Sequence, residues 1–118
     1  MNGSEIELYL LHFKGSEKSF PFDKTTAVYK VGGKMFALMG EHQGHMQMNL
    51  KCDPVYALEL RHIYNSVTAG YHMNKKHWNT IILNGDVPKE ELFSMIEDSY
   101  NLVFYSLTKK LQASILNA

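Results

Sequence analysis

The chain has 118 residues, of which 45% are hydrophobic and 20% charged, as is ordinary for one soluble globular domain with a single core. Lys plus Arg and Asp plus Glu both total 12, so no net field attracts the protein to nucleic acid or to a membrane, and a charged partner must be held by a local patch. The single cysteine, Cys52, excludes an internal disulfide and fits a reducing compartment.

Nothing in the sequence directs the protein to a membrane or out of the cell. The first residues lack the basic and apolar regions of a signal peptide, and no apolar run approaches the roughly 18 residues of a membrane span. We therefore expect a cytoplasmic monomer with no membrane association, folded as a single domain over residues 1–118. Cys52 lies between Lys51 and Asp53, where a half-buried structural thiol is a more usual role than a nucleophile.

A short helix is expected at the N-terminus. Ser4 and Glu7 have the form of a capping box, and the apolar spacing that follows predicts a helix over residues 5–13. Gly15 offers the left-handed residue that ends many helices. The expected buried face of this helix comprises Ile6, Tyr9, Leu10 and Phe13.

An antiparallel sheet is expected after a loop at residues 16–24. Residues 26–31 and 34–39 are rich in apolar and aromatic side chains, and Gly32-Gly33 between them is typical of a tight hairpin. Residues 45–51 alternate strictly, which predicts a half-buried strand. Its two faces are Met46, Met48 and Leu50 on one side and Gln47, Asn49 and Lys51 on the other.

The loop expected at residues 40–44 and the strands beside it contain histidines, which can bind a metal, and methionines, which can form a binding surface. His42 and His45 lie near Glu41, but no cysteine and no third ligand at a recognisable spacing accompanies them, so we expect no metal site. Methionines are typical either of an adaptable binding surface or of a core, and strand alternation favours the core here. The methionines concerned are Met35, Met39, Met46 and Met48.

A second helix is expected to begin at Asp53-Pro54, because Asp is a preferred N-cap and proline is tolerated at the first helical position. The helix is expected to end near Ile63, and residues 65–69 indicate a connector. Its expected inner face is Val55, Leu58 and either His62 or Ile63.

The C-terminal third predicts one strand and two helices. Residues 78–83 form the expected strand, Asp86-Val87-Pro88 begins a long helix, and Thr108 caps a last helix over residues 109–116. The buried stripe of the long helix is expected to be Leu92, Ile96, Ser99, Tyr100 and Val103. The whole pattern predicts an α+β fold, with helices on one face of a mainly antiparallel sheet.

The most informative stretch runs from Gly70 to Leu83. It contains the only tryptophan, Trp78, two of the six histidines, and the Lys75-Lys76 pair. No Asp or Glu occurs between Glu59 and Asp86, whereas Arg61 and both of these lysines lie in that window. Cations and an aromatic ring gathered in a neutral chain indicate a binding surface rather than a particular reaction.

Five sequence blocks between about Phe20 and Val103 resemble the MmcQ/YjbR family of small bacterial proteins. They are VGGKMFAL (31–38), LKCDP (50–54), GYHMNKKHW (70–78), LNGDVP (83–88) and DSY (98–100). The resemblance implies a CyaY-like sandwich, similar to bacterial frataxin, in which helices cover one face of an antiparallel sheet. Members are described as DNA-binding proteins with a "double wing" arrangement, so the resemblance implies DNA as a partner, and it supplies no catalytic residue.

The likeness to frataxin also raises the question of iron, which would need a dense acidic ridge along the first helix and strand. The four acids of that region are interspersed with three lysines: Glu5, Glu7, Glu17 and Asp23 against Lys14, Lys18 and Lys24. Because shared fold does not transfer function, we expect no iron site, no other metal and no cofactor.

The first functional hypothesis is weak, largely sequence-independent DNA binding through a basic and aromatic patch around residues 70–79. Lysine and arginine neutralise phosphates, asparagine and histidine donate to phosphates or base edges, and an aromatic ring can stack on an unpaired base. The candidate nucleic-acid-binding residues are Lys51, Arg61, Tyr71, His72, Asn74, Lys75, Lys76 and His77. The structural alternatives are a solvated turn at the lysine pair and a core position for Trp78, and for Trp78 we expect the core.

A second hypothesis, from a different class, is a small-molecule or protein-partner binding module that uses the same Tyr, His and Trp surface. DNA binding with about three to five phosphate contacts has a slope of log affinity against log salt of about −3 to −5 on duplex DNA, whereas a pocket for a neutral ligand hardly responds to salt. Catalysis is not expected, because no nucleophile is paired with a base and no hydrolase, zinc-protease or phosphate-loop motif occurs.

Overall fold

The structure is a computed structural model and describes residues 3–70 and 73–118. In these residues six strands form one antiparallel sheet, in the order β1-β2-β3-β4-β6-β5. The strands are β1 (Glu17–Ser19), β2 (Ala27–Val31), β3 (Lys34–His42), β4 (His45–Lys51), β5 (Val67–Ala69) and β6 (Trp78–Ile82). The helices are α1 (Gly3–His12), α2 (Pro54–Ile63), α3 (Lys89–Phe104) and α4 (Lys109–Leu116). None of the helices in the described part of the chain has the length and apolar character needed to cross a membrane.

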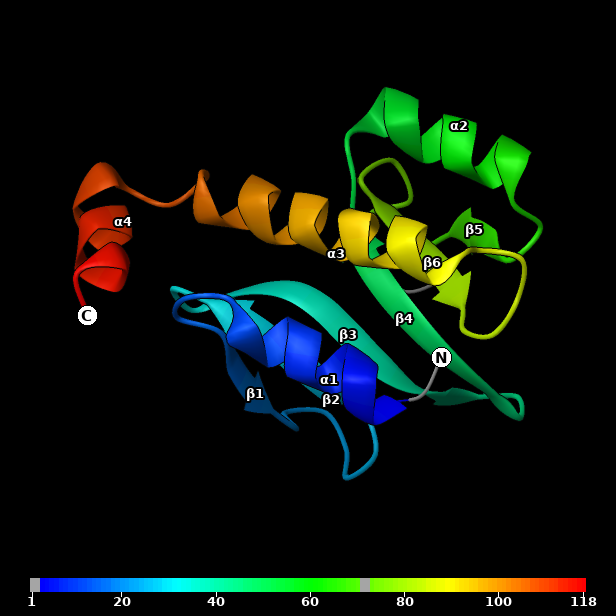
Figure 1. The fold of residues 1–118 in the computed structure, drawn as a ribbon, viewed down its shortest axis with the longest axis horizontal. Coiled ribbons are helices and arrows are strands. Elements are labelled where there is room, and N and C mark those ends of the chain that lie inside the picture. The colour runs from blue at the N-terminus through cyan, green and yellow to red at the C-terminus, as the bar shows by residue number, and fades with distance from the viewer. Residues whose placement is uncertain (1–2, 71–72) are drawn as a thin grey trace.

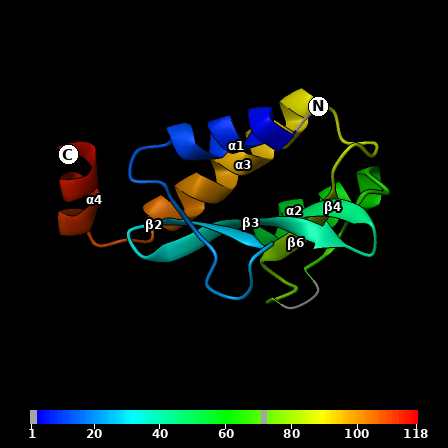
Figure 2. The ribbon, with the colours of Figure 1, turned by 90° about the horizontal axis from the view of Figure 1, so that it is seen from below.

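Helices α1, α2 and α3 all lie on the same side of the sheet. α1 and α3 run side by side over this side, and α2 packs beside them against β5 and β6 (Figure 1). Viewed at right angles, α1 and α3 lie above the sheet and no described helix lies below it (Figure 2). The α+β fold predicted from the sequence is therefore confirmed. The side without helices is named the open face below.

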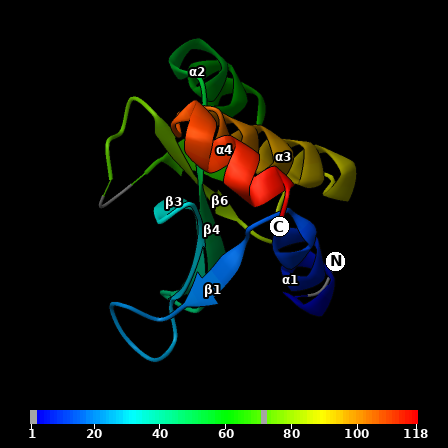
Figure 3. The same cartoon turned by 90° about the vertical axis from the view of Figure 1, so that its left-hand side faces the viewer.

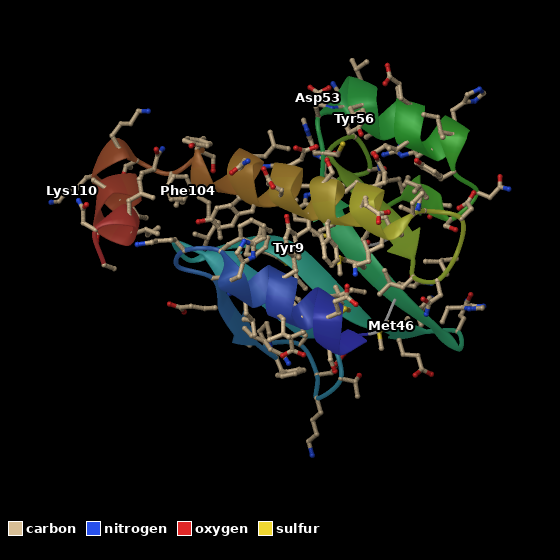
Figure 4. The ribbon with its side chains drawn as sticks, viewed as in Figure 1. Tyr9, Met46, Asp53, Tyr56, Phe104 and Lys110 are labelled. Atoms are coloured by element: carbon tan, nitrogen blue, oxygen red, sulfur yellow. The ribbon has the colours of Figure 1, made fainter. Side chains whose placement is uncertain are left out.

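The core lies between the sheet and α1 and α3. The buried stripe predicted for α3 is confirmed along its whole length: Leu92, Ile96, Ser99, Tyr100 and Val103 are all buried. Stacked rings join α1 to α3, with centroids 4.3 Å apart for Tyr9 and Phe93 and 4.5 Å apart for Phe13 and Tyr100. Figure 4 shows Tyr9 extending from α1 toward α3.

An irregularity in β3 explains the serine in the buried stripe. The register between β2 and β3 shifts after Tyr29 and leaves Phe36 without a partner on β2, so that Phe36 and Ala37 are both fully buried. The hydroxyl of Ser99 donates to the Phe36 carbonyl (2.6 Å) and accepts from the Lys51 amide (2.8 Å). Ser99 thus satisfies two backbone groups where the hydrogen bonding between strands is interrupted.

Three loop predictions are wrong because strand pairing decides these segments. Residues 40–44 are not a loop: β3 continues to His42, and a two-residue turn at Gln43-Gly44, with positive φ at both, leads into β4. The segments at 16–24 and 65–69 contain β1 and β5, the three-residue edge strands of the sheet. Short edge strands owe their conformation to the neighbouring strand, and so have little signal in the sequence.

Two helix starts differ from prediction. α1 begins at Gly3, so Ser4 lies inside the helix instead of capping it. α3 begins at Lys89, directly after Asp86-Val87-Pro88, and Asp86 does not cap it but has another role. Its carboxylate accepts from the amides of Asn65 (2.7 Å) and Ser66 (2.9 Å), and so holds the entry to β5.

The inner face predicted for α2 is wrong, although its N-cap is confirmed by two amide hydrogen bonds to the Asp53 side chain. Ala57 and Leu60 face the core. The small side chain of Ala57 lets α2 approach β6, where the Asn79 amide donates to the Ala57 carbonyl (3.3 Å). The residues predicted to face inward are instead exposed: Val55, Leu58, His62 and Ile63.

Candidate functional site: the open face of the sheet

Strand pairing places a central row of three side chains on the open face. Met48 and Leu50 of β4 are buried under the helices, so the residue between them, Asn49, faces the opposite side. Asn49 pairs with Leu38 on β3 and with Thr80 on β6, and directly opposed residues share a face. The Asn49 amide therefore lies between a leucine and a threonine side chain.

The next row along β4 contains the predicted site residue Lys51. Lys51 pairs with Trp78 on β6, so both side chains project from opposed positions on the open face. The core position predicted for Trp78 is therefore wrong. Alternate residues of a strand face opposite sides, and the buried residue Ile81 lies three positions further, on the helix-covered side.

Two loops extend from the sheet on the side away from α1 and α3. They are residues 20–26 and 73–77, and Figure 3 shows both on the far side of the sheet from these helices. Phe22, Asp23 and Thr26 of the first loop and Met73 of the second line a groove of about 500 Å³ over the central row. The floor of the groove includes Met35, Leu38, Gln47 and Asn49.

Polar groups of the groove are oriented but incompletely bonded. The hydroxyl of Thr80 donates to Oδ1 of Asn49 (2.5 Å), which fixes the amide plane. The Nδ2 hydrogens of Asn49 and the side-chain amide of Gln47 have no hydrogen-bond partner among residues 3–70 and 73–118. A few oriented polar groups over an apolar floor are typical of ligand sites.

Charge is segregated along the groove. Asp23 and Glu41 line it at the end near Gly40 and Gln47. The amides and hydroxyls of Thr25 and Thr26 donate to Asp23 and hold the pKa of that carboxyl below its ordinary value, so it is charged at neutral pH. The opposite end of the groove leads to Lys51.

The predicted lysine pair lies beyond the Lys51 end of the groove. The Cys52 amide donates to the His77 carbonyl (2.7 Å), so the chain before Trp78 continues past this end, and Lys75 and Lys76 are exposed there. Neither these lysines nor Lys51 forms an ion pair with a carboxylate of the described chain. The ion pairs of that part of the chain join Lys18 to Glu7 and Lys89 to Glu5.

Arg61, predicted to contact phosphate, is bonded inside the protein. Its Nε donates to Oδ1 of buried Asn79 (2.6 Å), and its Nη2 donates to the carbonyls of Lys75 and Trp78. The structure therefore places Arg61 on the helix-covered side of β6, where it anchors the loop that carries the lysines.

The other predicted residues of this loop form its turn or lie outside the described residues. Oδ1 of Asn74 accepts from the Lys76 amide (2.9 Å), and its carbonyl accepts from the amides of His77 and Trp78 (3.1 and 3.0 Å). Asn74 is exposed and His77 is half-buried. Tyr71 and His72 lie outside the described residues.

A second hollow, of about 470 Å³, lies between α2 and α3, where Figure 4 shows Asp53 and Tyr56. Its charged lining residues are Asp53 and Asp98, so it repels anions. Burial, with a contribution from these carboxylates, raises the pKa of the Cys52 thiol to about 11, and the thiol is protonated and buried, as a structural cysteine is. The described residues contain no group of three or more His, Cys, Asp or Glu side chains placed to hold a metal.

The sequence analysis did not predict the groove or the two loops, residues 20–26 and 73–77, that flank it. The alternation of residues 45–51 places Gln47, Asn49 and Lys51 on one face of the strand. This alternation was the sequence feature that could have indicated part of the groove floor. The prediction for Met35 is wrong, since it lines the groove, and Met46 is 43% exposed, whereas Met39 and Met48 are core residues as predicted.

Comparison with known proteins assigns the family. The YjbR family model matches residues 11–102, which include every strand described above. The Escherichia coli O157:H7 protein YbdF is 40% identical over 99 residues, covering 84% of this chain and 81% of YbdF. YjbR of Escherichia coli K12 is 31% identical over 100 residues, covering 85% of each chain. The crystal structure of a Deinococcus radiodurans protein with a DUF419 domain is 36% identical with a TM-score of 0.88, covering 95% of this chain and 86% of that one. The chain therefore belongs to the YjbR family.

Proposed function

We propose that this protein is a non-enzymatic nucleic-acid-binding protein that holds DNA weakly, with little sequence preference, on the open face. The observation that carries the proposal is a set of three lysines without a carboxylate partner in the described chain: Lys51, which pairs with Trp78 on the open face, and Lys75 and Lys76, which are exposed in the loop just before Trp78. Phosphates would lie on the lysines, and they position a nucleic acid without reading its sequence.

The distribution of acids supports the open face over the other hollow. The hollow between α2 and α3 is lined by Asp53 and Asp98, and it would repel a phosphate backbone. Burial, with a contribution from Glu97 and Glu91, raises the pKa of Asp98 above its ordinary value, which shows that further acids lie near this hollow.

Because the Arg61 guanidinium is hydrogen-bonded inside the protein, we expect only about three phosphate contacts. The slope of log affinity against log salt should then be about −3 on duplex DNA and about −2 on a single strand. The loops at 20–26 and 73–77 are our candidates for the two wings that the family resemblance implies. A cytoplasmic location fits the free thiol of Cys52 and would give access to nucleic acid.

Reversing the charge of the lysine pair tests the proposal. Lys75→Glu with Lys76→Glu should weaken binding of a labelled 20-nucleotide DNA by more than about tenfold at low salt, measured by fluorescence anisotropy. Lys109→Glu with Lys110→Glu is the matched control, because this exposed pair lies on α4 at the far end of the molecule (Figure 4). Equal affinity of the two double variants, or no binding by the parent protein at low salt, would refute the proposal.

The groove supports a second candidate, the binding of a small molecule or protein partner. Its volume of about 500 Å³ lies within the range of about 300–1,000 Å³ typical of ligand pockets. Phe22 and Met73 line it, whereas His77 and Trp78, the expected residues that the structure describes, do not. A neutral ligand whose affinity is the same at low and high salt would favour this candidate over the first.

A further inference from the structure

We propose that the groove on the open face receives one unpaired base of a bound strand, and that the protein therefore prefers single-stranded nucleic acid to duplex. This inference rests on the proposed function and adds the form of nucleic acid and the place of the base. It is carried by three features of the groove: its charge polarity, its exposed aromatic wall and two side-chain amides with donors that bond to no other described residue.

The charge polarity orients a nucleotide. Lys51 lies one row beyond Asn49 on β4, whereas Asp23 lies at the opposite end of the groove. A phosphate is attracted to the lysine end and repelled from the acidic end. The part of a nucleotide that can lie between the two ends is the base, which is uncharged at neutral pH.

The walls and floor of the groove suit a flat ring. Phe22 is 69% exposed, so its side chain contributes little to the core, yet it lines the groove. Met73 from the second loop and Leu38 from the floor offer further apolar contact. Stacking of a base on an exposed aromatic ring tolerates every base, since each has a flat π face.

The amides complete the site without imposing a sequence. Thr80 fixes the Asn49 amide, and the N–H donors of this amide, which bond to no other described residue, can donate to a ring nitrogen or carbonyl of a base. The Gln47 amide can donate or accept, because its torsions are not constrained by a hydrogen bond to another described residue. These groups match the edge of a base that is not already paired.

Duplex DNA offers no such base, because its bases are stacked and paired, and extruding one costs a few kcal/mol. A single strand binds to the lysines and can also place a base in the groove. We therefore expect a 12-nucleotide single strand to bind at least about tenfold more tightly than the same strand in a duplex, at equal salt.

The test uses the full chain and a pair of phenylalanine variants. Phe22→Ala should weaken single-strand binding by roughly five- to hundredfold, the range found when a stacking ring is removed, and should leave the salt slope unchanged because no charge is lost. Phe20→Ala is the control, since Phe20 is in the same loop, is 47% exposed and does not line the groove. Circular dichroism should show that both variants remain folded.

A second readout covers the case in which Phe22→Ala fails to fold. Trp78 is the only tryptophan and lies one row from Asn49 on the open face, so its fluorescence should be quenched by the single strand and less by the duplex. Asn49→Leu should reduce that quenching while the lysines keep their charge.

The outcomes separate this inference from the proposed function. Weaker single-strand binding by Phe22→Ala but not by Phe20→Ala, together with preference over duplex, supports the base site. Equal binding by both variants, or equal affinity for duplex, overturns it, and the proposed function still stands if the Lys75 and Lys76 double variant alone loses binding. If a free mononucleotide binds as tightly as the single strand, the groove is a site for a soluble nucleotide, and the inference that it receives a base of a bound strand is overturned.

Discussion

Ser99 illustrates how a single hydroxyl can be required inside an apolar helix face. It is fully buried and bridges the Phe36 carbonyl and the Lys51 amide. Ser99→Ala removes both hydrogen bonds from backbone groups at or near the core, so we expect a loss of about 1–3 kcal/mol in the free energy of unfolding. Urea denaturation measures this loss.

The matched control for Ser99 lies on the same helix. Ser94 is exposed, and Ser94→Ala should change the free energy of unfolding by less than about 0.5 kcal/mol. Equal stabilities of the two variants would show that the bridge between β3 and β4 contributes nothing.

Arg61 is a positioning residue for the loop at residues 73–77, which contains Lys75 and Lys76. Arg61→Ala leaves Asn79, which is 1% exposed, without a side-chain donor, and it removes the bonds to the carbonyls of Lys75 and Trp78. We expect a loss of about 1–3 kcal/mol in unfolding free energy and weaker DNA binding, with the salt slope unchanged because the lysines keep their charges. Exposed His62 supplies the control variant, His62→Ala.

The salt slope is the decisive quantity for Arg61. Were its guanidinium a phosphate ligand, removing it would make the slope shallower by about 0.7 to 0.9. That result, with stability unchanged from His62→Ala, would contradict the positioning role.

At the scale of elements, a carboxylate links the turn after β6 to the start of β5. The hydroxyl and amide of Ser66 and the amide of Asn65 donate to Asp86 and hold its pKa below the ordinary value. A depressed pKa in the folded state stabilises the fold at pH values above about 4, the ordinary value for Asp, and this contribution is lost as the pH falls through the folded pKa.

The pH dependence of stability tests this link. The difference in unfolding free energy between the parent and Asp86→Asn should be constant from pH 7 to about pH 5 and should shrink below about pH 4. Because Asp86 is exposed, solvent screens the effect and it should be small. Urea denaturation at several pH values measures it, and a difference that stays constant down to about pH 2 would exclude Asp86 as the source.

Elements with a strong local signal were predictable, and those defined by their neighbours were not. The cap at Asp53 places the start of α2, and strict alternation places β4, because both signals lie within a few residues. β1 and β5 are three residues long and depend on pairing with β2 and β6. The apolar residues of α2 occur on two sides of the helix, so spacing alone chose the wrong side.

The candidate site shows the same division. The alternation of β4 placed Lys51 and Asn49 on one face, and the composition of residues 70–83 indicated the lysine loop. The groove depends on Phe22 and Met73, which are far apart in the sequence and meet only because their loops flank the same strands. The role of Arg61 depends on contacts with buried Asn79 that no spacing reveals.

The whole molecule separates its charges although their sum is zero. Acids line the hollow between α2 and α3, whereas lysines without a carboxylate partner in the described chain lie at and beyond the end of the open-face groove that is opposite Asp23. A neutral protein can therefore present an attractive field on one side and a repulsive field on the other. Binding should be confined to one side of the sheet and should be weak at high salt.

Amide chemical-shift mapping by NMR tests this central claim most directly. The labelled protein would be titrated at low salt with a single-stranded DNA of 12 nucleotides. We expect the largest shift changes at open-face positions, Leu38, Asn49, Lys51, the loop at 73–77 and the Trp78 indole, with little change on the exposed sides of α1 and α3. Changes concentrated between α2 and α3 around Asp53 and Asp98, or no changes at all, would contradict the account.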